Sequence, residues 1–337
     1  MYFFVNDYND IGTDEILDAL VAAKDEYNVG YGFDNHSNRA RTLIKKALTN
    51  DNVDIHFVPG GTPANVLGLA CGMRQENSVL APISGHIEGH EAGSIEATGI
   101  KIETILAPNG KLSRALLEEK ISQFGPEYTT VPKKVYISNT TELGEVYTKK
   151  ELEDIYDFCK SNDMYLFIDG ARLAHALASE KADYDLTDIC NLCDIFYLGG
   201  TKNGLMLGEA IVIVNEDLKK NFINLQKQKG YILAKSFALG IMFETLFKDS
   251  DSYTKGARHA YEMAKKLAEG FEAKGYELAY PFESNQVFVK IDDETLTKWE
   301  NLAAFEISGR DNDMNIVRFV TTYRTSTSDI DGFLAAI

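Results

Sequence analysis

The feature that most limits the fold of this chain is a series of continuous apolar segments separated by helix-like segments. Strands that are apolar along their whole length, rather than at every second residue, are typical of a mostly parallel sheet covered by helices on both faces. Seven such strands are predicted, at residues 53–58, 78–82, 100–106, 134–138, 164–168, 194–198 and 210–214. Helices are predicted between them at residues 62–73, 113–124 and 149–161, with Thr62 as an N-cap and Pro63 at the first helical position. We therefore expect an α/β fold built on this sheet.

The pattern changes after Asn215, where long helices are followed by shorter strands. Helices are predicted at 216–229, 232–248 and 253–274, strands at 276–279, 286–291 and 317–321, and a helix at the end of the chain. A chain of 337 residues has room for about two domains. We expect a large α/β domain over residues 1–250 and a smaller α+β domain over 251–337. Within the first 50 residues, helices at 14–27 and 37–49 form an arm that wraps the large domain or reaches a partner subunit.

Charge and hydropathy exclude several classes of protein. The formal net charge of −17 repels phosphate backbones, which argues against a nucleic-acid partner. The longest apolar stretch, 237–247, is interrupted by Gly240 and Glu244 and is too short to cross a bilayer. The first residues lack the basic and apolar regions of a signal peptide. We therefore expect a cytoplasmic protein with no membrane partner.

Neither the cysteines nor the histidines predict a metal site. Cys190 and Cys193 form a single C-x-x-C pair, with no second pair to complete a zinc site. His86 and His90 lie four residues apart but lack the His-Glu-x-x-His order, and Gly89 weakens a helix there. We expect small buried thiols in a reducing compartment, and no metal.

Three predicted strands each end in a loop that carries polar chemistry, and ligands of open α/β sheets gather at such ends. The loops are Pro59-Gly-Gly-Thr-Pro-Ala-Asn65, Asp169-Gly-Ala-Arg172 and Gly199-Gly-Thr-Lys-Asn203. Taken singly, each has an ordinary structural explanation: a tight turn, a helix N-cap and a salt-bridged lysine. Taken together, they offer backbone N–H groups for a phosphate, a carboxylate for a ring nitrogen and a lysine for an aldehyde. Pyridoxal phosphate carries a phosphate, a ring nitrogen and an aldehyde.

With these motifs the chain resembles the low-specificity L-threonine aldolases, which belong to the β-eliminating lyase group of fold-type-I pyridoxal-phosphate enzymes. Gly-Thr-x-Ala-Asn, Asp-Gly-Ala-Arg and Gly-Gly-Thr-Lys occur in the family's order. Further matching segments are Asp7-Tyr8, Gly30–Asp34, Gly85-His86, Glu91–Gly93 and Ile316–Thr321. The resemblance implies the aspartate aminotransferase-like fold, and homodimers or homotetramers with sites at the subunit interface.

The resemblance also assigns roles around the cofactor. Lys202 would form the Schiff base, Asp169 would hold the pyridinium nitrogen, and Arg172 would lie next to the phenolic oxygen. The remaining cofactor residues would be Gly61 and Thr62 at the phosphate, His86 stacked on the ring and Lys227 in the place of an arginine that reaches a phosphate across the interface.

On the substrate side, the resemblance assigns the substrate carboxylate to Arg318. Strand alternation places Arg318 on the face opposite Val317 and Phe319, although an interdomain salt bridge would also explain it. Asn6 stands where many relatives have a serine, and Thr141 stands where many have a histidine near the substrate's β-hydroxyl. The motif after Arg318 reads Thr321-Thr322 rather than Thr-His.

The implied activity is retro-aldol cleavage of L-threonine or L-allo-threonine, β-hydroxy-α-amino acids, to glycine and an aldehyde. Lys202, Asp169 and His86 would be catalytic, with His86 or a bound water as the base. Alternatives that keep the cofactor are β-elimination, racemisation and transamination. An alternative from another class is a non-catalytic binding or assembly subunit, which retention of Lys202, Asp169 and Thr62 argues against.

Overall fold

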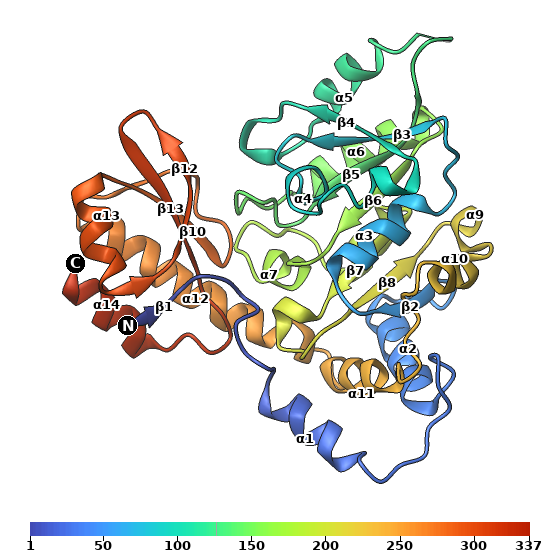
Figure 1. Ribbon diagram of the computed structural model, residues 1–337, viewed down its shortest axis with the longest axis horizontal. Coiled ribbons are helices and arrows are strands. Elements are labelled where there is room, and N and C mark those ends of the chain that lie inside the picture. Colours follow the sequence, from blue (N-terminus) through green and yellow to red (C-terminus); the bar gives the residue numbers. More distant parts are fainter. Residues whose placement is uncertain (126) are drawn as a thin grey trace.

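A seven-stranded sheet forms the centre of the larger of two lobes in the computed structural model, which describes residues 1–125 and 127–337 (Figure 1). Its strand order is β2-β8-β7-β6-β5-β3-β4. The strands are β2 (Asp54–Val58), β3 (Asn77–Pro82), β4 (Lys101–Ile105), β5 (Val131–Ser138), β6 (Tyr165–Asp169), β7 (Ile195–Gly199) and β8 (Glu209–Ile213). β8 is antiparallel to both of its neighbours, and the other six strands run in one direction. The predicted sheet is confirmed, with strand ends shifted by a few residues.

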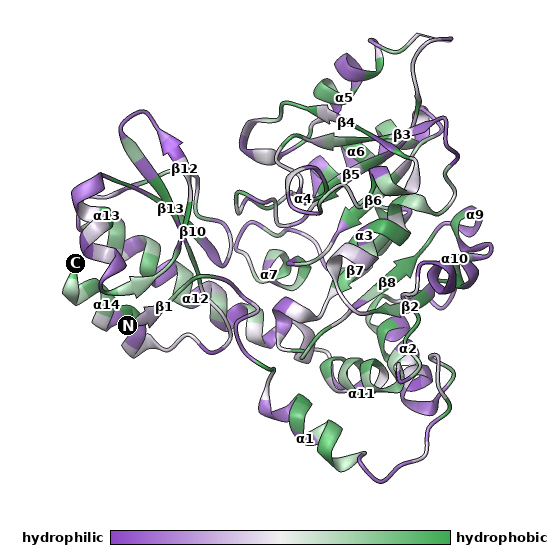
Figure 2. Ribbon diagram, viewed as in Figure 1, coloured by the Kyte–Doolittle hydropathy of each residue, from purple (hydrophilic) through white to green (hydrophobic). Residues whose placement is uncertain are grey.

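Each face of the sheet is buried under its own apolar cluster. In β6, Leu166 and Ile168 belong to one cluster and Phe167 to the other. Much of β7 and β8 therefore appears hydrophobic (Figure 2). Since both faces are covered, the polar groups of the sheet can reach a ligand only at its edges and strand ends.

The helices of this lobe mostly follow the prediction. They are α1 (Asp14–Ala22), α2 (Asn35–Ala47), α3 (Gly61–Ala70), α4 (His86–Gly89), α5 (Arg114–Ile121), α6 (Lys149–Ser161), α7 (Leu173–Leu177), α8 (Leu186–Asn191), α9 (Glu216–Lys219), α10 (Phe222–Gln228) and α11 (Phe237–Leu246). α6 has the predicted bounds, and Thr148 and Glu151 form a capping box at its start.

Four helix predictions are wrong in detail. The helix predicted at 14–27 ends at Ala22. α3 begins at Gly61 with Gly60 as its N-cap, so Thr62 is inside the helix and caps nothing. The helix predicted at 216–229 is broken into α9 and α10 because Asn221 takes a left-handed conformation with φ of 59°. The helix predicted at 232–248 begins only at Phe237.

The smaller lobe is an antiparallel sheet in the order β12-β13-β10-β9, packed with three helices. Its elements are α12 (Ser252–Ala273), β9 (Glu277–Leu278), β10 (Gln286–Ile291), α13 (Asp293–Glu300), β12 (Glu306–Asp311), β13 (Met314–Val320) and α14 (Thr327–Ala336). β12 and α13 were not predicted. β12 is almost wholly exposed, so its residues carry no apolar signal.

The first residues of the chain pack on the smaller lobe. β1 (Tyr2–Phe3) pairs in parallel with β11 (Ala303–Ala304), and Phe4 is buried in the apolar cluster of this lobe. Both termini therefore lie together on it (Figure 1). α1 and α2 pack against α11 of the larger lobe. The arm thus contacts both lobes, and the division at residues 250/251 stays a prediction.

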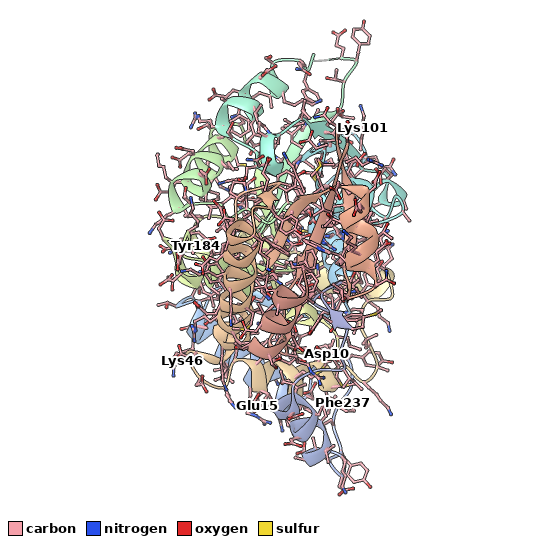
Figure 3. The ribbon with its side chains drawn as sticks, turned by 90° about the vertical axis from the view of Figure 1, so that its left-hand side faces the viewer. Asp10, Glu15, Lys46, Lys101, Tyr184 and Phe237 are labelled. Atoms are coloured by element: carbon pink, nitrogen blue, oxygen red, sulfur yellow. The ribbon has the colours of Figure 1, made fainter. Side chains whose placement is uncertain are left out.

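A side view places the two ends of the molecule (Figure 3). Lys101, where the edge strand β4 begins, lies near one end, and Asp10 and Glu15 of the arm lie near the other. In the part of the chain that the structure describes, no helix combines the length and the apolar character needed to cross a bilayer.

A buried lysine anchors the carboxyl end of α3. Lys134 of β5 has no exposed surface, and its Nζ donates to the carbonyl oxygens of Gly68 at 2.7 Å, Leu69 at 3.2 Å and Cys71 at 2.5 Å. These carbonyls have no partner within the helix because the helix ends there. The ammonium group also faces the negative end of the helix dipole. Lys134 thereby fixes the helix whose opposite end carries the Gly60-Gly61-Thr62 loop.

We expect Lys134→Ala to destabilise the fold by about 3 kcal/mol or more, because it leaves buried carbonyls without a donor. The measurement is the free energy of unfolding in urea. Lys133→Ala is the matched control, since Lys133 pairs with the exposed Asp163 and its loss should cost far less. Equal losses in the two variants would contradict the anchoring role.

Candidate active site

The three polar loops follow the carboxyl ends of β2, β6 and β7, which point to the same edge of the sheet. β2 leads to Gly61 and Thr62 at the start of α3, and β6 ends at Asp169. β7 leads to Lys202 in the 3₁₀ turn η3 (Thr201–Asn203). β3 ends at the same edge and leads to His86 at the start of α4. The sheet topology therefore brings these predicted site residues to one region.

Asp169 is buried and accepts hydrogen bonds at both carboxylate oxygens. Tyr136 donates to Oδ2 at 2.7 Å, Asn65 donates to Oδ2 at 3.0 Å, and the Ala171 N–H donates to Oδ1 at 3.0 Å. The Tyr197 hydroxyl also donates to Oδ1. Burial raises the pKa of both tyrosines well above the usual range, so they remain neutral donors. Asp169 is thus held as a fixed anionic acceptor.

Arg172 is paired with an acid of the N-terminal arm. Its Nε lies 2.7 Å from Oδ2 of Asp7, and its Nη2 lies 3.1 Å from Oδ1, with both side chains buried. Asn285 of the smaller lobe donates to the same Asp7 Oδ2 at 3.0 Å. Burial alone would raise the pKa of Asp7, but the charge and hydrogen bonds of Arg172 hold it well below its usual range. Asp7 therefore joins the arm to both lobes beside the site.

Lys202 is a partly buried amine without a direct anionic partner. Within the described residues its Nζ makes no ion pair, and it lies 5.9 Å from the ring centroid of Tyr8. Burial lowers the pKa of Lys202, and the positive charge of Arg172 lowers it further against the attraction of Asp7. A lysine whose proton is weakly held is suited to act as a nucleophile.

His86 is held by an acid that also connects it to Asp169. The Nδ1 of His86 lies 2.9 Å from Oε1 of Glu91, and Asn65 donates to the same oxygen at 2.6 Å. Ser94 donates to the other oxygen of Glu91 at 2.8 Å. Burial lowers the pKa of His86, but the Glu91 hydrogen bond and nearby acids outweigh this and raise it overall. Asn65 thus bridges the two carboxylates of the site.

The start of α3 offers free backbone N–H groups. In the described chain no side chain caps this helix, and a Cβ on Gly60 would meet no atom within 4 Å. At Gly61 a Cβ would meet only the Tyr197 hydroxyl, at 3.5 Å. An uncapped helix N-terminus with open space beside it suits an anionic group. With the unpaired amine of Lys202 and the fixed Asp169, these residues fit pyridoxal phosphate.

The predicted substrate residues Arg318 and Thr141 are connected through Gln286. Nη1 of Arg318 donates to Oε1 of Gln286 at 3.2 Å, and Gln286 donates to the Thr141 carbonyl at 3.5 Å. Arg318 also pairs with Glu306 on the neighbouring strand. Val317 and Phe319 are buried on the opposite face, as strand alternation predicts. The Thr141 hydroxyl accepts from the Glu145 N–H at 3.1 Å and donates to the Asn109 carbonyl at 3.4 Å.

Two predicted residues make contacts within or with the N-terminal arm. The Asn6 side chain accepts from the Tyr8 N–H at 3.1 Å and so closes a turn in the arm. Lys227 is exposed near the end of α10, and its Nζ lies 4.6 Å from the ring centroid of Tyr31.

The sequence prediction did not assign roles to several residues that build the site. Asp7, Asn65 and Glu91 lay within motifs already noted, so the motifs themselves carried a signal. Tyr136, Tyr197 and Gln286 are buried polar residues inside strands that are otherwise read as core. Only the folded structure shows that the Tyr136 and Tyr197 hydroxyls reach Asp169 and that Gln286 of the smaller lobe reaches Thr141.

We expect Glu91→Gln to lower the pKa of His86, because it removes the anion that stabilises the imidazolium form. A pH titration followed by the ring ¹⁵N or ¹H NMR signals of His86 would measure this. Glu88→Gln serves as the control, because it removes an exposed acid from α4, the short helix that begins at His86. An unchanged pKa in Glu91→Gln would show that Glu91 does not set the charge of His86.

Comparisons with known proteins identify relatives of this chain. A family model described as Beta-eliminating lyase matches residues 6–294. The chain is 31% identical over 287 residues to the low specificity L-threonine aldolase of Pseudomonas sp. (strain NCIMB 10558), covering 84% of this chain and 82% of that protein. It is 25% identical to the alanine racemase TOXG of Cochliobolus carbonum, covering 70% of this chain and 62% of that protein.

Solved structures give the same result for the fold. The Leishmania major threonine aldolase superposes with a TM-score of 0.97 and 41% identity, covering 99% of this chain and 98% of that chain. A structure of SPT with PLP has a TM-score of 0.72 at 14% identity, covers 99% of this chain and 86% of that chain, and shares the fold alone. The chain therefore has the fold of the pyridoxal-phosphate-dependent transferases and belongs to the beta-eliminating lyase family.

Proposed function

We propose that this protein is a pyridoxal-phosphate-dependent aldehyde-lyase that cleaves L-threonine and L-allo-threonine to glycine and acetaldehyde. The observation that carries the proposal is the unpaired amine of Lys202 at the same sheet edge as the fixed Asp169 and the open start of α3. The similarity to threonine aldolases over nearly the whole chain supports the choice of substrate.

Six residues would hold the cofactor. Gly61 and Thr62 would bind its phosphate, Asp169 its ring nitrogen, Arg172 its phenolic oxygen and Lys202 its aldehyde carbon, and His86 would stack on its ring. When bound, pyridoxal phosphate supplies an acceptor for the electron pair that remains on the α-carbon after the Cα–Cβ bond breaks. The charge of Asp169 favours protonation of the ring nitrogen, and this charge is fixed by four donors.

His86, or a water bound by it, would take the proton of the substrate's β-hydroxyl. With Nδ1 directed to Glu91, the Nε2 atom is available to accept a proton. Glu91 stabilises the imidazolium that results, which makes His86 a stronger base. His86 can then return this proton to the α-carbon, which gives glycine, or release it to solvent.

Recognition of the substrate would divide between its carboxylate and its hydroxyl. Arg318 would bind the carboxylate through its planar guanidinium, in exchange for the partly exposed Glu306. The hydroxyl of Thr141 is already engaged with two backbone groups, so it offers little to the β-hydroxyl. Both configurations at the β-carbon should therefore be accepted.

Other reactions on the same cofactor remain the alternative, and the likeness to an alanine racemase keeps racemisation among them. The products distinguish them. Incubation with a panel of amino acids, followed by assays for aldehyde, keto acid, ammonia and D-amino acid, separates aldol cleavage from transamination, β-elimination and racemisation. Glycine and acetaldehyde in equal amounts from threonine are the expected result.

We further propose a cytoplasmic homodimer or homotetramer with sites at the subunit interface. The arm exposes several large apolar side chains that a second copy would cover: Ile11, Val21, Tyr27, Val29 and Phe33. Lys227 lies beside this surface and would reach the partner's cofactor phosphate. The four cysteines are free and buried, as expected in a reducing compartment.

We expect Lys202→Ala to abolish the visible absorbance of the protein and its aldehyde release, because the cofactor loses its covalent attachment. Borohydride reduction followed by peptide mapping should place the cofactor on Lys202 in the unmodified sequence. Lys220→Ala, which removes an exposed lysine between α9 and α10, should retain both properties. Fixation of the cofactor on another lysine would overturn the assignment.

We expect Arg318→Lys to raise the KM for threonine and allo-threonine alike while leaving cofactor content unchanged. The loss of a bidentate charged pair costs about 1–3 kcal/mol. Glu306→Gln is the matched control, since it removes the competing partner and should not weaken substrate binding. An unchanged KM in Arg318→Lys would show that Arg318 only forms a cross-strand salt bridge. Strong discrimination between threonine and allo-threonine would contradict loose recognition of the β-hydroxyl.

A further inference from the structure

Glu209 is a buried carboxylate at the active-site edge that the proposed reaction does not use. It is the first residue of β8 and is 3% exposed. Because β8 runs against its neighbours, its first residue lies between the last residues of two other strands, opposite Val58 of β2 and Gly199 of β7. Glu209 therefore sits between the loop that opens α3 and the turn that carries Lys202.

The carboxylate of Glu209 is hydrogen-bonded to the turn that carries Lys202. Its Oε2 accepts the Gly200 N–H at 2.6 Å. Thr201 in turn accepts the Gly208 N–H at 2.9 Å. A Cβ on Gly200 would lie 2.4 Å from the Gly208 carbonyl oxygen, so the turn is packed too tightly for a side chain there. The turn that carries Lys202 is thus held by Glu209 at Gly200 and by Gly208 at Thr201.

Charged and titratable groups face Glu209 from several elements. Lys202 attracts its negative charge from η3, and Asp169 repels it from β6. The charge of Glu209 also raises the pKa of Tyr197 on β7 and of Tyr253 on α12, although burial is the larger cause for both. The Tyr253 hydroxyl is buried without a partner among the described residues. Burial raises the pKa of Glu209 itself to about 7.

We propose that Glu209 is a positioning residue for Lys202, which holds the turn through Gly200 and contributes to how tightly the lysine retains its proton. This inference rests on the proposed function, in which Lys202 is the reactive amine. An ionised Glu209 stabilises the ammonium form of Lys202, and a protonated Glu209 does not. Over the pH range around 7, the reactivity of the lysine would then follow the ionisation of a carboxylate that never touches the substrate.

Labelling of Lys202 tests this coupling without any catalytic assay. The full-length chain, freed of bound carbonyl compounds by dialysis, is treated with trace acetic anhydride across a pH series, and the Lys202 peptide is quantified by mass spectrometry. Glu209→Gln keeps an oxygen acceptor for the Gly200 N–H but removes the charge. At a pH where Glu209 is ionised and Lys202 is protonated, we expect labelling of Lys202 to be about tenfold faster in this variant.

Two further variants separate charge from geometry. Glu209→Asp keeps the charge and should retain the pH profile of the unmodified protein even if the turn is loosened. Glu283→Gln is the matched control, because Glu283 is also buried and accepts one backbone N–H, that of Val146, away from Lys202. Its labelling profile should be unchanged.

The protein loaded with pyridoxal phosphate gives a second readout, the pH dependence of its visible absorbance. Glu209→Gln should shift this titration to lower pH with unchanged cofactor content. Identical labelling and absorbance profiles in Glu209→Gln and the unmodified protein would overturn the proposal. Absence of a visible band in the unmodified protein would instead refute the proposed function, and the labelling series would still decide the role of Glu209.

Discussion

The buried ion pair of Asp7 and Arg172 is the interaction on which the geometry of the site depends. Burying two charges costs several kcal/mol per ion unless the pair is well oriented and its remaining atoms are hydrogen-bonded. Here two nearly parallel N–H···O contacts join the pair, and Asn285 donates to the carboxylate from the smaller lobe. The carboxylate of Asp7 therefore joins the arm to both lobes near the amine of Lys202. His175, buried nearby, is kept neutral because burial lowers its pKa to about 4.

A second network connects the proposed base to the proposed ring partner. Asn65 donates from one amide nitrogen to both Glu91 and Asp169, so His86 and Asp169 are related through a single rigid side chain. Asn65 is in α3, whose N-terminus would bind the phosphate and whose carboxyl end is anchored by Lys134. The groups that would contact the ring face, the ring nitrogen and the phosphate of the cofactor are thus all connected to α3. Such shared support keeps catalytic groups at fixed separations, which is what transition-state stabilisation needs.

The sequence was sufficient for features that depend on local pattern and order along the chain. The apolar runs predicted the seven strands, and the three polar loops lie at the ends of β2, β6 and β7 on one edge of the sheet, as predicted. It was insufficient where tertiary contacts decide. The bounds of α3 and the break at Asn221 are set by loop geometry, and the exposed β12 has no apolar pattern to detect. Glu209 was hidden for a different reason: it begins an apolar strand, and only the antiparallel register of β8 places it between two functional loops.

The arrangement of acids around Lys202 explains how a strongly acidic chain can hold a lysine whose pKa is lowered. A carboxylate in direct contact would hold the ammonium form and suppress nucleophilic attack. Asp7, Asp169 and Glu209 all act electrostatically on Lys202 or respond to its charge, yet each is bonded elsewhere: Asp7 to Arg172, Asp169 to tyrosine hydroxyls and Glu209 to the Gly200 N–H. Each of these carboxylates thus acts on Lys202 through its charge and is hydrogen-bonded to another group. Burial and the adjacent Arg172 act in the opposite sense and lower the pKa of Lys202. The proton affinity of the amine is therefore the balance of distant charges, and small changes in any one of them will move it.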